Sequence, residues 1–221
     1  MGKLKDRLLP NYTFGEELFN MISHIAGAFL GMVVLTMCVA RCAVRANAFG
    51  MVGSAIYGGT MIVLYIMSSV YHGLPRNNVK KVFRVLDHCT IYFLIAGTYT
   101  AIALSAIREV DPAAGWIIFG IQWGLTALAV TLTAIDLKKF EIFSMCCYAI
   151  MGWCIIVVPG LAIKALTVPG FVLILIGGVI YTLGAVLYAV GKKIKYIHSV
   201  FHLFVFAGSL VQFLGVFMYA L

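Results

Sequence analysis

Long apolar runs separated by short polar segments make up most of this chain. A helix needs about 20 mainly apolar residues to cross the hydrocarbon core of a bilayer, and seven runs approach or reach that length. We therefore predict seven membrane-spanning helices, at about residues 19–40, 49–71, 85–107, 114–135, 142–158, 171–190 and 196–221. The fifth run is the shortest and is bordered by Pro159 and Pro169, which interrupt helices.

The composition indicates the same class of protein. Of the 221 residues, 63% are hydrophobic and only 11% are charged, which is far too apolar for a soluble domain. We predict an all-α membrane protein with one seven-transmembrane helix bundle, residues 19–221, behind a cytoplasmic lead at residues 1–18. The lead is polar and charged, so we do not expect it to be a cleavable signal peptide.

The positive charges favour one orientation of this bundle. Twelve of the 16 lysines and arginines fall in the lead and in the loops after the second, fourth and sixth spans, and four fall on the opposite side. Because these residues concentrate in cytoplasmic loops, we predict a cytoplasmic N-terminus and an external C-terminus. The net charge of +8 then indicates contact with anionic lipid at the cytoplasmic face. Interleaved basic and aromatic runs are missing, so nucleic acid is not an expected partner, and the oligomeric state is left open.

Three histidines form a candidate metal site. His198 and His202 are four residues apart at the start of the last span, so they share one helical face. His72 ends the second span, and the predicted topology brings it to the same cytoplasmic depth. Three imidazoles with one open position are typical of a catalytic zinc site. We therefore predict Zn²⁺ bound by these three histidines, provided that their helices face one another.

Two further polar residues are candidates for the same site. Asp87 opens the third span, and Ser68 precedes His72 by one helical turn, so they could hold a water on the metal. Each also has a simpler explanation, because a carboxylate in a first turn interacts with the helix dipole and serine is common at helix contacts. His24 and His88 lie on the same side, where interfacial or hydrogen-bonded histidines are usual.

The order of these motifs resembles a known superfamily, the progestin and adipoQ receptors. The matching segments are Ser68-x-x-x-His72, Leu86-Asp87-His88 and His198-x-x-x-His202. The stretch from Glu16 to His24 is similar to the bacterial branch, the haemolysin III proteins. The resemblance implies seven helices with a cytoplasmic N-terminus, zinc on the three histidines, and Asp87 and Ser68 near a zinc-bound water. The wider superfamily includes alkaline ceramidases, which hydrolyse the amide of N-acyl sphingoid lipids.

Two functions are consistent with this sequence. The first is a zinc-dependent hydrolase of a lipid amide or ester in the cell membrane, in which Asp87 orients or deprotonates the water and Ser68 supports the water or the oxyanion. The second is a non-enzymatic membrane protein with structural zinc, either a sensor of lipids or membrane energetics or a haemolysin-like channel. An open metal position joined to a lipid-accessible cavity would favour the first, and a fourth protein ligand would favour the second.

Overall fold

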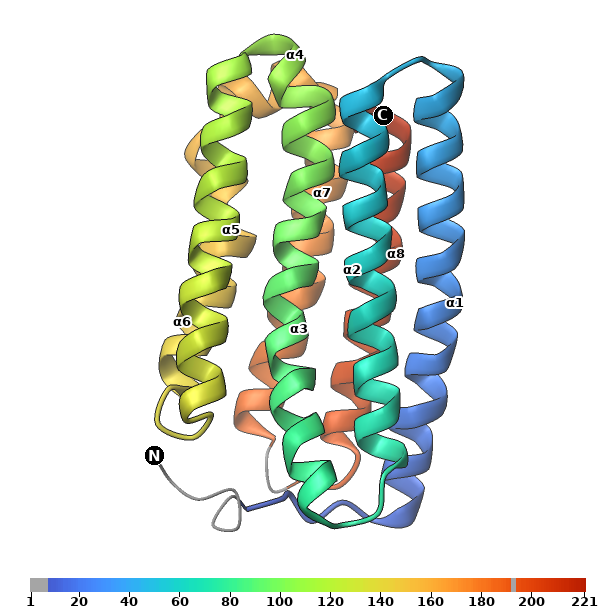
Figure 1. Ribbon diagram of the computed structural model, residues 1–221, viewed down its shortest axis with the longest axis vertical. Helices are drawn as coiled ribbons and strands as arrows, with labels where there is room; N and C mark the ends of the chain where they lie inside the picture. Colours follow the sequence, from blue (N-terminus) through green and yellow to red (C-terminus); the bar gives the residue numbers. More distant parts are fainter. Residues whose placement is uncertain (1–7, 192–193) are drawn as a thin grey trace.

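The protein is a bundle of long helices that run roughly parallel to one axis (Figure 1). The computed structural model describes residues 8–191 and 194–221, and no strand occurs among them. The α-helices are α1 Phe14–Val44, α2 Ala48–Gly73, α3 Asn78–Ile102, α4 Arg108–Val110, α5 Pro112–Ile135, α6 Glu141–Gly152, α7 Pro159–Val190 and α8 Ile197–Gly215. π-Helical turns at Ala103–Ile107 and Val216–Ala220 extend α3 and α8, and a 3₁₀ turn at Cys154–Val157 follows α6.

Within the described residues, six helical segments are long and apolar enough to cross a membrane, which confirms the class of the fold. They are Phe14–Val44, Ala48–Gly73, Asn78–Val110, Pro112–Ile135, Pro159–Val190 and Ile197–Ala220. Large apolar side chains such as Phe29, Ile117 and Leu183 are exposed along them, as expected for surfaces in contact with lipid. The predicted fifth span differs, because α6 has only 12 residues before the 3₁₀ turn. A seventh crossing by this segment therefore stays a prediction.

The sixth predicted span begins earlier in the structure than the sequence pattern indicated. α7 starts at Pro159 and is interrupted at Thr167, whose φ of 60° and ψ of 169° are not helical. Pro169 explains the break, because its ring clashes with the carbonyl four residues earlier and disfavours helical geometry in the residue before it.

Small residues allow α1 and α2 to pack closely. A Cβ atom added at Gly58 of α2 would lie 2.5 Å from the Cα of Leu35 on α1, and one added at Gly31 of α1 would lie 2.8 Å from Cγ1 of Ile62. Such close helix contacts are typical of membrane bundles, where van der Waals packing supplies much of the association energy.

Helix caps define the ends at which the polar residues gather. Thr13 caps α1 in a capping box with Glu16. Asn77 caps α3 through the backbone N–H of Lys80, so α3 begins well before the residue 85 expected from the sequence. The prediction that Asp87 lies in a first turn is therefore wrong. Asp87 lies in the third turn, where the helix dipole no longer explains a carboxylate.

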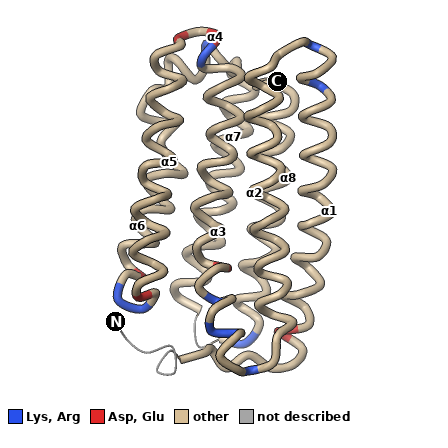
Figure 2. Tube along the Cα trace, in the orientation of Figure 1, with Lys and Arg blue, Asp and Glu red and all other residues tan. Residues whose placement is uncertain are grey.

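The basic residues are divided unequally between the two ends of the bundle (Figure 2). The turn between α2 and α3 and the turn between α5 and α6 carry lysines and arginines at the end where α1 and α8 begin. At the opposite end, Arg41 lies in the last turn of α1, Arg45 caps that helix and Arg108 begins α4. α1 begins and α8 finishes at opposite ends (Figure 1), as an odd number of crossings requires.

Candidate metal centre

The three predicted ligands meet at the end of the bundle where α1 and α8 begin. His72 lies in the last turn of α2, and His198 and His202 lie in the first two turns of α8. Tyr196 lies just before α8, has a left-handed conformation and donates its backbone N–H to Oε1 of Glu16, 2.7 Å away. The first turn of α1 therefore holds the beginning of the helix that carries two of the histidines.

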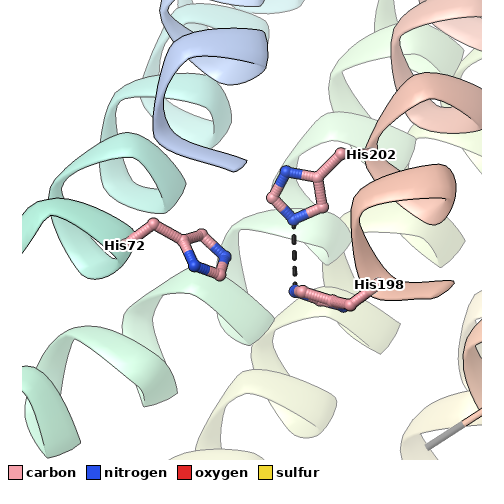
Figure 3. A group of neighbouring side chains, drawn as sticks. All are labelled: His72, His198 and His202. Carbon is pink, nitrogen blue, oxygen red and sulfur yellow. Dashed lines mark hydrogen bonds between the residues drawn. The ribbon is translucent and has the colours of Figure 1, made fainter. Parts of the chain in front are cut away.

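The three imidazole rings converge on one point (Figure 3). One ligand atom from each ring lies within 4.8 Å of the others, and all three side chains are buried. The Nε2 atoms of His198 and His202 are 3.2 Å apart. Two nitrogens bound to one tetrahedral zinc ion are about 3.4 Å apart, because each Zn–N bond is about 2.0–2.1 Å long. The arrangement predicted from the sequence is thus confirmed as a group that could hold a metal ion.

An unpaired buried nitrogen supports the assignment of a ligand site. Nε2 of His72 is buried without a hydrogen-bond partner among the residues that the structure describes. Buried polar atoms are usually paired, so an unpaired group of this kind calls for a bound ion or water. Imidazole nitrogens suit zinc and other transition metals better than magnesium or calcium, which prefer oxygen.

An ion pair that the sequence analysis missed supports His72. Nδ1 of His72 lies 2.6 Å from Oε2 of Glu17, and Oε1 of Glu17 lies 2.8 Å from Nζ of Lys80. A carboxylate accepts the Nδ1 proton, so the lone pair of this ring is left on Nε2, as a metal ligand requires. The sequence pattern placed Lys80 in the basic loop after the second span, but its side chain is buried at 3% exposure. The sequence did indicate that Glu17 faces the histidines, because Glu17 precedes His24 by two helical turns and lies on the same helical face.

Ser68 and Asp87 lie beside the histidines in a single cavity of about 990 Å³. Ser68, Asp87, His198 and His202 all line it. Ser68 is buried, and its Oγ has no hydrogen-bond partner within the described part of the chain. Oδ2 of Asp87 is 3.9 Å from Nδ1 of His88. Their roles at a metal therefore stay predictions.

The two remaining histidines differ from each other. Nδ1 of His88 lies 2.8 Å from the carbonyl oxygen of Arg84, which fits the hydrogen-bonded histidine expected from the sequence. His24 is buried on α1, and neither of its nitrogens has a partner in the described residues. Its ring stacks on His202 with centroids 3.7 Å apart. His24 therefore belongs to the cluster.

A short segment before α1, residues 8–13, covers the same end of the site. Arg76 donates to the carbonyl oxygen of Pro10 at 2.7 Å and to Oδ1 of Asn11 at 3.0 Å, and Arg84 donates to the carbonyl oxygen of Leu8 at 2.6 Å. Tyr12 of this segment stacks on His198. Burial raises the pKa of the Tyr12 phenol, so it is neutral at physiological pH.

The helical bundle and its histidine group define an integral membrane protein with a candidate metal site. The chain belongs to the haemolysin-III-related family, whose sequence profile matches residues 12–213. It is 36% identical to hemolysin-3 of Bacillus cereus over 206 residues, which cover 93% of this chain and 92% of that protein. It is 31% identical to the hemolysin-3 homolog of Bacillus subtilis (strain 168) over 208 residues, 94% and 96% of the two chains.

A human protein shows that the similarity extends beyond bacteria. The monocyte to macrophage differentiation factor of Homo sapiens is 26% identical over 213 residues, which cover 92% of this chain and 84% of that protein. The resemblance to haemolysin III proteins and the adipoQ receptors, inferred from the serine, aspartate and histidine motifs, is therefore confirmed.

Proposed function

We propose that this protein is a zinc-dependent hydrolase of a lipid amide or ester. The observation that carries the proposal is the position of the histidine group, because His198 and His202 line a cavity that continues into the apolar part of the bundle. A zinc ion held by these histidines would polarise a carbonyl group and lower the pKa of a water molecule to about 7.

The neighbouring side chains supply the other groups that hydrolysis requires. Asp87 accepts a proton from the attacking water, and Ser68 donates its unpaired Oγ–H to the carbonyl oxygen on which negative charge develops. Water adds to the carbonyl carbon, the C–N or C–O bond breaks, and a fatty acid leaves with an amine or an alcohol. The buried and largely apolar surroundings strengthen both interactions.

The cavity has the length and the lining that an acyl chain needs. Apolar residues such as Leu64, Leu94 and Val205 line it beyond the histidines. Along α8 it extends from His198 to Gln212, a distance of roughly 21 Å at 1.5 Å per residue. The acyl chains of one leaflet fill about half of a 30 Å hydrocarbon core, so a lipid tail fits this length.

The number of ligands supports catalysis over a structural metal. The group has three members among the described residues, so a metal there would keep one open position. In the alternative function, a non-enzymatic lipid sensor or haemolysin-like channel, a fourth protein ligand would be expected to close the site.

The proposal includes a topology and a location. The segment Glu141–Val157 makes the seventh crossing, the N-terminus is cytoplasmic, the C-terminus is external, and the site lies near the cytoplasmic face of the plasma membrane. The basic residues at the histidine end support this orientation, because they would contact anionic lipid there.

The test is fatty acid release from defined lipids. Zinc-loaded protein in lipid–detergent micelles is given long-chain N-acyl amides and esters, and the products are measured by mass spectrometry. We expect release by the wild type, a loss of at least about 100-fold in Asp87→Asn, and little change in the matched control Asp111→Asn, which makes the same substitution at the exposed cap of α5. Zinc-loaded wild type that releases no fatty acid from either class, or Asp87→Asn that is fully active, would overturn the proposal.

A further inference from the structure

All three candidate ligands are contacted by side chains from the first 24 residues. Tyr12 stacks on His198, Glu17 hydrogen-bonds to His72 and His24 stacks on His202, although the described residues 8–24 provide none of the three candidate ligands. Rotation about χ2 of histidine is only weakly restricted by the side chain, so a ligand ring needs an external contact to hold its plane. The contacts to the three rings differ in kind.

The first contact is the hydrogen bond between Glu17 and His72. The 2.6 Å separation between Oε2 and Nδ1 directs Nε2 of His72 toward the other two rings. Lys80 holds the carboxylate in place from its other oxygen at 2.8 Å. Outer hydrogen bonds of this kind usually orient metal-binding histidines, and their loss lowers metal affinity by roughly 10- to 100-fold.

The second contact is the stack of His24 on His202. The centroids are 3.7 Å apart and the planes differ by 14°. The face of the His24 ring therefore holds the plane of the His202 ring, a role that an outer hydrogen bond has in most metal-binding histidines. His24 is itself held edge-on by Tyr65, at 5.0 Å, and the Tyr65 hydroxyl donates to Oγ of Ser209 on α8 at 2.8 Å.

The third contact is the stack of Tyr12 on His198. The ring centroids are 5.0 Å apart and the planes differ by only 6°. Nδ1 of His198 is also buried without a hydrogen-bond partner in the described part of the chain. Tyr12 is held over the site because Arg76 and Arg84 bind the backbone of its segment at Pro10 and Leu8.

We propose that Tyr12, Glu17 and His24 are positioning residues of the metal centre. They hold the three ligand rings in a geometry suited to a tetrahedral ion, so the segment before α1 and the first three turns of α1 set its metal affinity. This inference rests on the metal site of the proposed function and adds residues that the histidine motifs themselves do not contain.

The test separates ring orientation from general damage to the fold. Zinc affinity is measured by competition with a chromophoric chelator, and Co²⁺-loaded protein is examined by visible absorption, which reports the geometry around the metal. Leu replaces each residue in Tyr12→Leu, Glu17→Leu and His24→Leu. Tyr12→Phe and His24→Phe keep a ring, and Glu17→Gln keeps an acceptor oxygen. Phe14→Leu is the control, because Phe14 is 82% exposed at the start of α1.

We expect Glu17→Leu to bind zinc roughly 10- to 100-fold more weakly than wild type, and Glu17→Gln to lose less. In Tyr12→Leu and His24→Leu, the zinc affinity should fall by between about twofold and about tenfold, which corresponds to the strength of one aromatic pair. The Co²⁺ spectrum of both variants should change. The two Phe variants and Phe14→Leu should keep the wild-type spectrum.

Two results would overturn the inference. The first is wild type that binds zinc tightly while the Leu variants bind it equally well, which would leave the proposed function standing. The second is equal losses in the Leu and Phe variants, which would show that the ring faces do not orient the ligands. Wild type that binds no zinc would remove both this inference and the proposed function.

Discussion

The buried ammonium group of Lys80 provides a sharp test of how this end of the bundle is held together. Its Nζ lies 2.8 Å from Oε1 of Glu17, 3.3 Å from the carbonyl oxygen of His72 and 3.0 Å from that of Leu74. The two carbonyls belong to the C-terminal end of α2, where the helix itself supplies no donors. The substitution Lys80→Met removes all three interactions while keeping most of the side-chain volume.

The expected loss in the free energy of unfolding follows from the Glu17 carboxylate, which Lys80→Met leaves without its lysine partner. Breaking a buried ion pair by removing one partner costs about 3–5 kcal/mol, because the remaining charge stays buried without compensation. Glu17 keeps its contact with His72 and has 16% of its side chain exposed, so we expect the lower end, about 3 kcal/mol. For a chain of this size, the melting temperature should fall by about 6–12 °C.

The assay is thermal unfolding in detergent with excess chelator, followed by circular dichroism, so that metal binding does not contribute. The double variant Lys80→Met/Glu17→Gln buries neither charge and should melt no lower than Lys80→Met alone. Lys138→Met is the control, because Lys138 is exposed. The reasoning is refuted by a melting temperature of Lys80→Met within about 2 °C of wild type, the range of a surface substitution.

Three further predictions concern the first two helices and the segments next to them. Gly58→Ala should lower the free energy of unfolding by about 1–3 kcal/mol, because the added Cβ would lie 2.5 Å from the Cα of Leu35. Gly59→Ala is the control, because its Cβ would have no atom within 4 Å, and equal melting temperatures of the two variants would contradict the prediction. Thr13→Ala removes the α1 cap and should lower stability by about 1 kcal/mol, with faster hydrogen exchange confined to the start of α1; unchanged exchange there would argue against the cap. Arg76→Gln should speed limited proteolysis within residues 8–13, and a wild-type cleavage rate would show that the arginine does not hold this segment.

Hydropathy and residue spacing were sufficient for the class of fold and for the three histidines. The spacing of His198 and His202 places them on one face, and alternation of the spans brings His72 to the same end. The positions of the helix ends were harder to predict. Asp87 lies in the third turn of α3 because Asn77 starts that helix within a polar stretch that hydropathy assigns to a loop.

The supporting residues could not be found from the pattern alone. Lys80 has the sequence context of a solvated loop cation, and only the approach of α1 to α2 and α3 explains its burial beside Glu17. Tyr12 precedes the first helix, and nothing in its local sequence indicates a stack on His198. Such contacts depend on which faces the helices present to each other, whereas periodicity gives only the faces that are apolar.

The most direct test of the account is the zinc content of the purified protein, measured by elemental mass spectrometry after purification without chelator. We predict about one zinc per chain in the wild type and in His88→Ala, whose histidine lies outside the group of three, because one tetrahedral site binds one ion. The zinc ion should be lost in each of the three ligand variants, His72→Ala, His198→Ala and His202→Ala. Wild type without zinc, or His88→Ala that loses as much zinc as His198→Ala, would contradict the assignment of the metal centre.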